Sequence, residues 1–340
     1  MGEDGLNEDG NKTVFSLGEY IIGGANVEIT LGEFNDLRQS RDIIRALRDI
    51  EDLFALVVTA FTELEKFLLS SSVVYLTDPF VEENDMERFF DRFRDTLNLH
   101  LLSLFTAARA YEEQTCQRIK EIYKANSEFK YNPKPDFSFS FDNSFEYRVM
   151  YGLRNHCLHA QLPIDGFTFG RSGQWQDGTP TWNKPSRSRI TINPYFSARE
   201  IIESRINKKV RDEVEKLDLG KLDMKYLLRN YIAQLSIIHG KIRSKTENVL
   251  GEALKKLFAA QEKLSSEENN EEIRNLSLWK QVNGKLIDRI YIEPSRLDRV
   301  VTLRKRWTSL NYINRAYISS ETILIKDTYP NDGADVYITK

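Results

Sequence analysis

The sequence predicts a mainly α-helical protein: an up-and-down helical bundle with an inserted β-hairpin and a small α/β region near the C-terminus. Three observations predict this class. Two long stretches repeat apolar residues at alternating steps of three and four. A segment rich in glycine and proline, 164–194, interrupts the helical pattern. The segment 276–340 mixes β-branched runs with a basic stretch.

The composition is that of a globular chain, with 41% hydrophobic, 29% charged and 11% aromatic residues. This is too apolar for a disordered protein. Cys116 and Cys157 fit no metal-ligand spacing, and they favour a reducing compartment over a disulfide framework. The most apolar window, 53–76, contains three charged residues, so it predicts no membrane span. The acidic N-terminus does not resemble a signal peptide, and we expect a cytoplasmic protein.

Two apolar seams predict two long helices, over about 33–72 and about 84–126. The first seam consists of Ile43, Leu47, Ile50, Phe54, Val57, Phe61, Leu64 and Leu68. The second seam consists of Met86, Phe90, Phe93, Leu97, Leu101, Leu104, Ala108 and Tyr111. A short connection joins the two helices, so we expect an antiparallel hairpin.

The rest of the chain is divided by its turn residues and prolines. A leader, 1–31, holds turn residues between two β-branched stretches and predicts a short strand pair. The bundle is expected over 32–264 with the hairpin inserted at 164–194, followed by a polar linker, 265–275, and the small α/β region, 276–340.

Within the bundle, two prolines interrupt the helical pattern before residue 144. A third helix is then predicted over 144–161, capped by Asn143 or Ser144 and ended by Pro163. After the hairpin the helical period returns, and a further long helix is predicted over 222–264.

The third predicted helix carries the polar residues of a candidate site. Tyr147, Tyr151, Asn155 and His159 recur every four residues, so they share one helix face. Arg154 follows Tyr151 by three residues, which lets the two side chains stack or hydrogen-bond. Arg154 and His159 stand about 140° apart around an ideal helix. They meet only if the arginine bends, the helix end unwinds, or a second copy of the chain supplies the other half.

These residue types suit RNA cleavage without a metal ion. A neutral imidazole can accept or donate a proton near neutral pH, so His159 is the candidate base or acid. A guanidinium binds phosphate through two parallel hydrogen bonds, so Arg154 is the candidate phosphate clamp. The amide of Asn155 can orient either group. The base would remove the proton of a ribose 2′-OH, whose oxygen attacks the adjacent phosphorus; DNA lacks this hydroxyl.

The segment LRNHCLHAQLP resembles the R-N-x-x-x-H signature of the HEPN superfamily, and Arg154, Asn155 and His159 match that signature. The resemblance covers residues 33–264. It implies a metal-independent endoribonuclease that leaves 2′,3′-cyclic phosphate ends and acts as a homodimer with two motifs facing each other. It also implies a role in toxin–antitoxin or anti-phage abortive-infection systems, with an antitoxin or regulatory protein as a partner.

Other interpretations of the motif stay open. His159 can instead satisfy a late carbonyl of its helix, and Arg154 can pair with Glu63 or Glu65 of the first helix. The rival hypothesis for the whole chain is a non-catalytic helical module that binds a partner protein, a nucleotide or RNA.

Three further residues are candidates for supporting roles: Tyr147, Tyr151 and His156. The two tyrosines can equally be core or interface residues, and His156 can be an exposed or neighbouring histidine outside the reaction. His100 and His239 lie inside helical patterns and are expected to be structural.

Charge is distributed unevenly along the chain. Residues 1–100 hold 21 Asp and Glu against nine Lys and Arg, whereas 273–318 hold ten Lys and Arg against three acids. This asymmetry suits either an acidic partner such as RNA or pairing between the segments. The candidate RNA-binding residues near tryptophans are Arg187, Arg189, Arg304, Lys305 and Arg306. No glycine-rich phosphate loop or metal-ligand motif is present in the sequence, so we expect no metal or cofactor.

Overall fold

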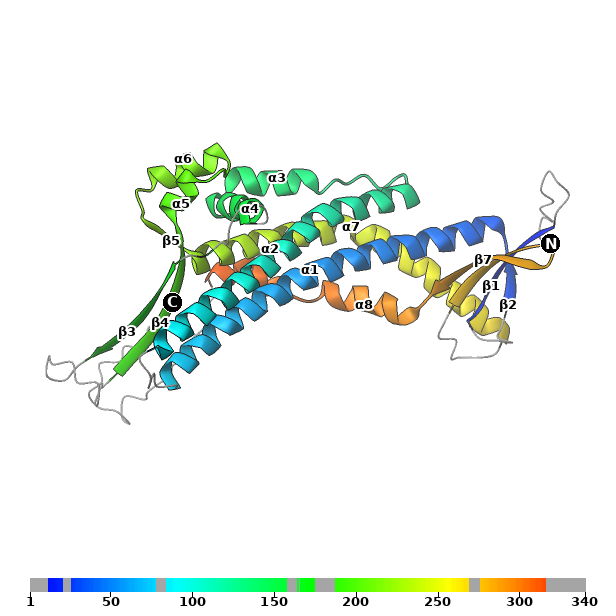
Figure 1. The fold of residues 1–340 in the computed structure, drawn as a ribbon. Helices are drawn as coiled ribbons and strands as arrows, with labels where there is room; N and C mark the ends of the chain where they lie inside the picture. The colour runs from blue at the N-terminus through cyan, green and yellow to red at the C-terminus, as the bar shows by residue number, and fades with distance from the viewer. Residues whose placement is uncertain are drawn as a thin grey trace, which may run out of the picture. The chain divides into compact units, whose positions relative to one another are not determined.

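A computed structural model describes residues 12–20, 26–77, 84–157, 164, 166–174, 187–268 and 276–315. The described part is mainly helical and holds two small antiparallel sheets (Figure 1). The predicted fold class is therefore confirmed. Within those ranges, none of the helices carries an apolar stretch that could cross a membrane.

Three long helices form about half of the described structure: α1 (Leu31–Thr77), α2 (Asp85–Ala125) and α7 (Met224–Glu268). Every residue of the first predicted seam is buried. In the second seam Met86 is exposed and Phe90 is half-buried, while the later members are buried. Burial of the seams is as expected for helices that each pack one narrow apolar face toward the core.

Two predicted helix ends differ from the structure. The helix expected to end at 264 continues through Glu268, so the first residues of the expected linker 265–275 are helical. Residues 269–275 lie outside the described residues. The third predicted helix is α4 (Phe145–Cys157), and residues 158–163 of the prediction likewise lie outside the described ranges.

One helix, α3 (Lys134–Asn143), was not predicted, because the prolines around it were interpreted as helix breakers. The backbone N–H of Asp136 donates to the carbonyl of Pro133 at 3.0 Å, so the helix starts among these prolines. The N–H groups of a first helical turn have no partner within the helix, and proline is therefore tolerated there.

The chain divides into two compact units, and every boundary between them falls inside a helix. Unit 1 takes its described residues from Met1–Val58, Ala107–Ser140 and Leu235–Thr308. Unit 2 takes its described residues from Thr59–Thr106, Phe141–Gln234 and Ser309–Lys340. Each unit thus contains a segment of α1, of α2 and of α7.

Unit 1 contains a four-stranded antiparallel sheet in the order β2-β1-β6-β7. Its strands are β1 (Thr13–Glu19), β2 (Asn26–Ile29), β6 (Leu276–Val282) and β7 (Lys285–Ile292). The expected leader hairpin is therefore present, and strand β1 also pairs with β6 of the C-terminal region. The local sequence pattern does not predict the pairing of β1 with β6.

The β6–β7 hairpin turns at Asn283 and Gly284, whose φ angles are +50° and +75°. Asn-Gly is the preferred pair for a two-residue turn in which both residues have positive φ. Strand β7 leads into α8 (Pro294–Arg304), which has proline in its first turn. The 3-10 helix η1 (Thr308–Arg315) follows.

Unit 2 contains a three-stranded sheet in the order β3-β4-β5, with β3 (Gly166–Gln174), β4 (Arg187–Ser197) and β5 (Lys221–Asp223). The first two strands are the predicted inserted hairpin. The Phe167 and Phe93 ring centroids lie 4.8 Å apart, so the hairpin packs on α2.

Two short helices follow in unit 2, α5 (Ala198–Glu203) and α6 (Lys208–Lys216). Their first turns are capped by the side chains of Ser197 and Asn207, which accept from backbone N–H groups.

Candidate functional site

The helix that carries the motif, α4, begins at a serine cap. The hydroxyl of Ser144 accepts from the backbone N–H of Tyr147 at 3.1 Å, and it donates to the carboxylate of Glu146 at 3.0 Å. Of the two predicted cap residues, Asn143 and Ser144, it is therefore Ser144 that caps the helix. Glu146 also accepts from the hydroxyl of Tyr226 at 2.9 Å, a hydrogen bond that raises the pKa of Tyr226.

An ion pair holds the first half of α4 in place. Arg148 donates to both carboxylate oxygens of Glu213 on α6, at 3.0 and 2.8 Å. Its third nitrogen donates to the carbonyls of Phe141 and Asp142, each at 2.7 Å, at the end of α3. The side chain of Arg148 is buried. Sequence reasoning missed this residue, since only the structure brings α6 beside it.

A glycine lets α4 approach the segment between α5 and α6. A Cβ built on Gly152 would lie 2.7 Å from the Cγ2 of Ile206 and 3.9 Å from that of Val210. No real Cβ contact is that short, so any side chain here would force the helix or Ile206 to move. Gly152 therefore fixes the position of the turn that carries Arg154.

Arg154 is buried, with 3% of its surface exposed, although its side chain is charged. Its guanidinium lies over the ring of Tyr151 at 4.3 Å from the centroid, and Nη1 donates to the hydroxyl of Tyr231 at 3.5 Å. The expected contact between Arg154 and Tyr151 is thus observed, as a cation–π stack. The Tyr231 contact, from α7, was not predicted.

Three tyrosines, Tyr147, Tyr151 and Tyr231, pack together beside Arg154, and we call them the tyrosine wall. The Tyr147 ring lies 5.1 Å from that of Tyr231 and 6.4 Å from that of Tyr151. Tyr147 is 1% exposed and Tyr231 is fully buried, whereas Tyr151 is half-buried. Tyr147 is accordingly a core residue, and Tyr151 forms the outer part of the wall.

The remaining motif residues lie at the end of the described helix. Asn155 and His156 follow Arg154 and are half-buried. The Nε2 of His156 is buried and makes no hydrogen bond with any described residue. His159, the candidate base, lies outside the described residues. The structure thus brings Arg154 and Tyr151 together, as expected, and gives no position for His159.

The carboxylates considered as partners of Arg154 have other partners. Glu65 accepts two hydrogen bonds from Arg229, at 2.8 and 2.9 Å. This pairing raises the pKa of Arg229. Glu63 is paired with Lys66 at 2.7 Å on the surface of α1.

The candidate RNA-binding residues fall into three groups. Arg187 and Arg189 belong to β4, but their side chains lie outside the described part. Lys305 and Arg306 are exposed. Arg304 is turned inward: it donates to Glu247 at 2.7 Å and lies 3.6 Å from Glu51. Its guanidinium is therefore bound to carboxylates and is not presented to solvent.

Arg304 belongs to a buried polar cluster in unit 1 that sequence reasoning missed. Its centre is Glu51 of α1, which is 1% exposed. Glu51 accepts from Nη2 of Arg243 at 2.6 Å and lies 3.0 Å from Nε2 of His239. The other nitrogen of His239 lies 3.0 Å from the hydroxyl of Tyr111. Arg243 also donates to the carbonyls of Leu303 and Arg306, so the cluster ties the end of α8 to α1 and α7.

The pKa values of this cluster are shifted so that Glu51 is charged and His239 is neutral near pH 7. Burial alone would raise the pKa of Glu51, but hydrogen bonds from His239 and Arg243 and the charge of Arg243 outweigh it and lower that pKa to about 2. Burial lowers the pKa of His239 more than Glu51 raises it, so the imidazole is neutral. Burial likewise lowers the pKa of Arg304. The only clue in the sequence was a pair of polar residues, Glu51 and His239, inside apolar helical stretches.

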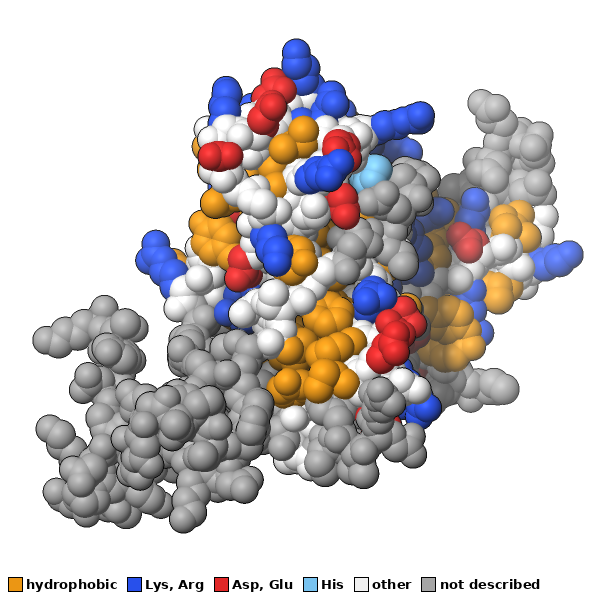
Figure 2. All heavy atoms as spheres, turned by 60° about the vertical axis from the view of Figure 1, so that its left-hand side comes forward, with side chains coloured by type: hydrophobic (Ala, Val, Ile, Leu, Met, Phe, Trp, Pro, Cys, Tyr) orange, Lys and Arg blue, Asp and Glu red, His pale blue; other side chains and the backbone are white. Residues whose placement is uncertain are grey.

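The face drawn in Figure 2 has no single dominant charge in its described part. Figure 2 shows lysine, arginine and acidic side chains interspersed over the described part of the face that comes forward. Within the described ranges, no group of three or more His, Cys, Asp or Glu could hold a metal ion.

Comparisons of the chain with protein-family models, with curated proteins and with solved structures found no match.

Proposed function

We propose that the protein is a metal-independent endoribonuclease of the HEPN type. The observation that carries this proposal is the setting of Arg154: a buried guanidinium stacked on Tyr151, with Asn155 beside it in the last described turn of α4. The sequence continues with His159 at the spacing of the R-N-x-x-x-H signature.

The stacked arginine suits the stabilisation of a phosphorane. Stacking uses the face of a guanidinium, whereas phosphate is bound by its N–H edge. A cation removed from bulk water acts more strongly on developing negative charge than a solvated one. The tyrosine wall would hold Arg154 in one orientation before the substrate arrives, which removes a reorganisation cost from the reaction.

In the proposed reaction, His159 takes the proton of the ribose 2′-OH, and the freed oxygen attacks the adjacent phosphorus. Arg154 stabilises the charge on the pentacoordinate phosphorus, and Asn155 orients the imidazole or a phosphate oxygen. The bond to the 5′-oxygen breaks, that oxygen takes a proton, and a 2′,3′-cyclic phosphate remains. A second copy of the chain would complete the site across a homodimer interface, since Arg154 and His159 lie on different sides of an ideal helix.

The biological setting belongs to the same proposal. Cleavage of cellular RNA would suit a cytoplasmic toxin or an abortive-infection effector, held in check by an antitoxin or another regulatory protein. RNA is then the substrate, and neither a metal ion nor a cofactor takes part in the reaction.

Incubation of the purified protein with RNA in EDTA tests the proposal, with His159→Ala as the inactive variant and His100→Ala as the control, since His100 lies in α2 outside the motif. We expect fragments with 2′,3′-cyclic phosphate ends from the wild type and the control. The His159→Ala variant should be slower by roughly 10²–10⁴-fold. Cleavage that disappears in EDTA, or that persists in His159→Ala, would overturn the proposal.

One observation favours a second candidate, a non-catalytic module that binds a protein, a nucleotide or RNA. Arg154 is 3% exposed and is in contact with two tyrosines, which is also the setting of a structural arginine. This candidate predicts no cleavage of any RNA by the wild type, with or without EDTA. It also predicts that Arg154→Lys changes stability alone.

A further inference from the structure

The four-stranded sheet of unit 1 has two faces of different chemistry. Leu17, Leu278 and Ile290 are paired across three strands and are buried, so they define the face toward the core. Trp279 pairs with Arg289 in the next register position, and side chains alternate along a strand. Trp279 and Arg289 therefore lie on the outer face.

The outer face carries one cation among three aromatic rings. The guanidinium of Arg289 lies 4.1 Å from the ring centroid of Tyr20, 5.2 Å from that of Trp279 and 5.4 Å from that of Tyr291. Arg289 makes no ion pair with any described carboxylate, and its Nε is buried without a hydrogen bond to described residues. The rings hold the cation in place, and they leave its charge uncompensated.

A serine hydroxyl holds the indole ring of Trp279. The indole N–H of Trp279 donates to the hydroxyl of Ser277 at 2.6 Å, and that hydroxyl lies 3.3 Å from the carbonyl of Gly18. Tyr20 and Tyr291 nevertheless remain 39% and 37% exposed. Aromatic surface that is both anchored and exposed is the kind on which nucleobases stack.

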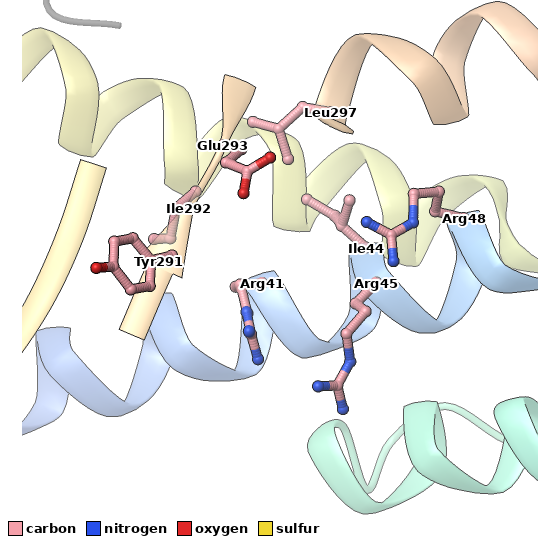
Figure 3. A pocket seen from close by; sticks show the side chains of 8 residues that line it. All are labelled: Arg41, Ile44, Arg45, Arg48, Tyr291, Ile292, Glu293 and Leu297. Carbon is pink, nitrogen blue, oxygen red and sulfur yellow. The ribbon is translucent and has the colours of Figure 1, made fainter. Parts of the chain in front are cut away.

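A small cavity adjoins the same cluster through Tyr291. Its volume is about 60 Å³, enough for a few water molecules or a small oxyanion. Figure 3 shows arginines of α1 on one side of the cavity, and the junction of β7 and α8 on the other. The lining side chains that matter are Arg41, Arg45, Arg48, Tyr291 and Glu293.

The arginines that line this cavity differ in whether they form ion pairs. Arg41 is paired with Asp42 at 2.7 Å and Arg48 with Asp49 at 2.9 Å. Arg45 is exposed and has no ion pair within the described part of the chain. Arg45 and Arg289 are thus two uncompensated cations, and Tyr291 borders both of their sites.

We infer that the surface around Tyr291 binds single-stranded RNA, with bases stacked on Tyr20, Trp279 and Tyr291 and phosphates bound by Arg45 and Arg289. Single-stranded nucleic acid is bound by this combination of aromatic rings and cations. The inference does not rest on cleavage by the α4 site, because these residues belong to another unit and only bind.

Fluorescence anisotropy with a labelled 2′-O-methyl RNA 20-mer tests this inference on the full chain. The methyl groups exclude attack by a 2′-oxygen, so binding is measured whether or not the protein cleaves RNA. The variants are Tyr291→Ala and Arg45→Glu. The control is Lys255→Glu, which makes the same change of sign at an exposed position of unit 1 on α7. Arg45 is exposed, so its substitution leaves the fold intact even if Tyr291→Ala perturbs the sheet.

We expect each of the two variants to weaken binding about tenfold, and the control to change it less than about twofold. A duplex of the same sequence should bind more weakly, because its bases are already stacked. Equal binding by Arg45→Glu and the wild type would overturn the proposal. AMP bound as tightly as the 20-mer would overturn the assignment to a strand and indicate a free nucleotide. Loss of binding by Lys255→Glu alone would place the RNA elsewhere.

Discussion

Arg154 in unit 2 is buried and Arg304 in unit 1 is half-buried, and their guanidinium groups contact different chemical groups. Arg304 lies among the carboxylates of Glu247 and Glu51. Arg154 is stacked on Tyr151 and donates to the hydroxyl of Tyr231. The carboxylates neutralise the positive charge of Arg304, so we expect the unit 1 cluster to contribute to stability. The tyrosine contacts of Arg154 orient its guanidinium through a ring face and a hydroxyl, neither of which carries a full negative charge.

Removal of the central carboxylate should have the largest effect on stability. Glu51→Gln leaves the half-buried Arg243 and Arg304 beside a buried neutral amide. Breaking one side of a buried ion pair costs about 3–5 kcal/mol. We expect the free energy of unfolding in urea to fall by this amount. Glu63→Gln is the control, because Glu63 has only an exposed pair with Lys66 and such pairs contribute about 0–1 kcal/mol. If Glu51→Gln and Glu63→Gln lower the free energy of unfolding by the same small amount, the buried cluster does not contribute more to stability than the exposed pair.

Acid should weaken the same cluster, in two steps. The pKa of Glu51 is lowered from 4.5 to about 2, so the stability it contributes is complete above about pH 4.5 and is lost as the pH falls toward 2. This amounts to roughly 3 kcal/mol. The pKa of His239 is also lowered, so the unfolded chain binds a proton below about pH 6.5 that the native state does not. Stability therefore begins to fall there.

Urea titrations between pH 7 and pH 3 measure this prediction. The Glu51→Gln variant is the control, because it lacks the titrating carboxyl and should lose less stability below pH 4.5. Parallel curves for the variant and the wild type would show that Glu51 does not supply the acid sensitivity.

Substitution of the stacked arginine should affect the reaction more than the fold. Arg154→Lys keeps the positive charge but loses the planar fork that binds phosphate. We expect RNA cleavage to slow about 100-fold, or about 2.7 kcal/mol in activation free energy. Arg199→Lys is the matched control, since Arg199 is exposed in the same unit and its ion pair is with Glu203. Unchanged cleavage by Arg154→Lys would assign Arg154 to structure.

The smallest expected effect concerns a pair of glycines. A Cβ at Gly152 would lie 2.7 Å from Ile206, whereas one at Gly251 in α7 meets nothing within 4 Å. Gly152→Ala should destabilise the protein by about 1–3 kcal/mol. Gly251→Ala should stabilise it by about 0.5–1 kcal/mol, because alanine favours the helix. Thermal unfolding of both variants measures the difference. If Gly152→Ala is as stable as Gly251→Ala, α4 is not held by close packing against Ile206.

The sequence predicted the parts of the fold that depend on local periodicity. The apolar seams placed α1 and α2, and the Gly- and Pro-rich segment placed the hairpin of β3 and β4. The pairing of β1 with β6 could not be predicted, since it joins strands more than 250 residues apart and depends on no local pattern. Helix α3 was missed because proline is a helix breaker in the interior but not in a first turn.

The candidate site was predicted in part for the same reason. The contact of Tyr151 with Arg154 follows from their spacing of three within one helix. Tyr231 and the ion pair of Arg148 with Glu213 come from other elements, and helix spacing carries no information about them. Arg304 was expected to face a partner, but its position in the unit 1 cluster depends on Glu51, which is distant in the sequence.

The central claim, that a ribose 2′-oxygen attacks its own phosphodiester beside Arg154, can be tested with one modified substrate. The preferred cleavage site is first mapped on a short RNA. The same RNA is then made with a single 2′-deoxy nucleotide on the 5′ side of that bond, and both are incubated with the wild type in EDTA. The account predicts that cleavage at this bond stops in the modified strand and continues at other bonds. Cleavage of the bond next to the 2′-deoxy nucleotide at the original rate would contradict it.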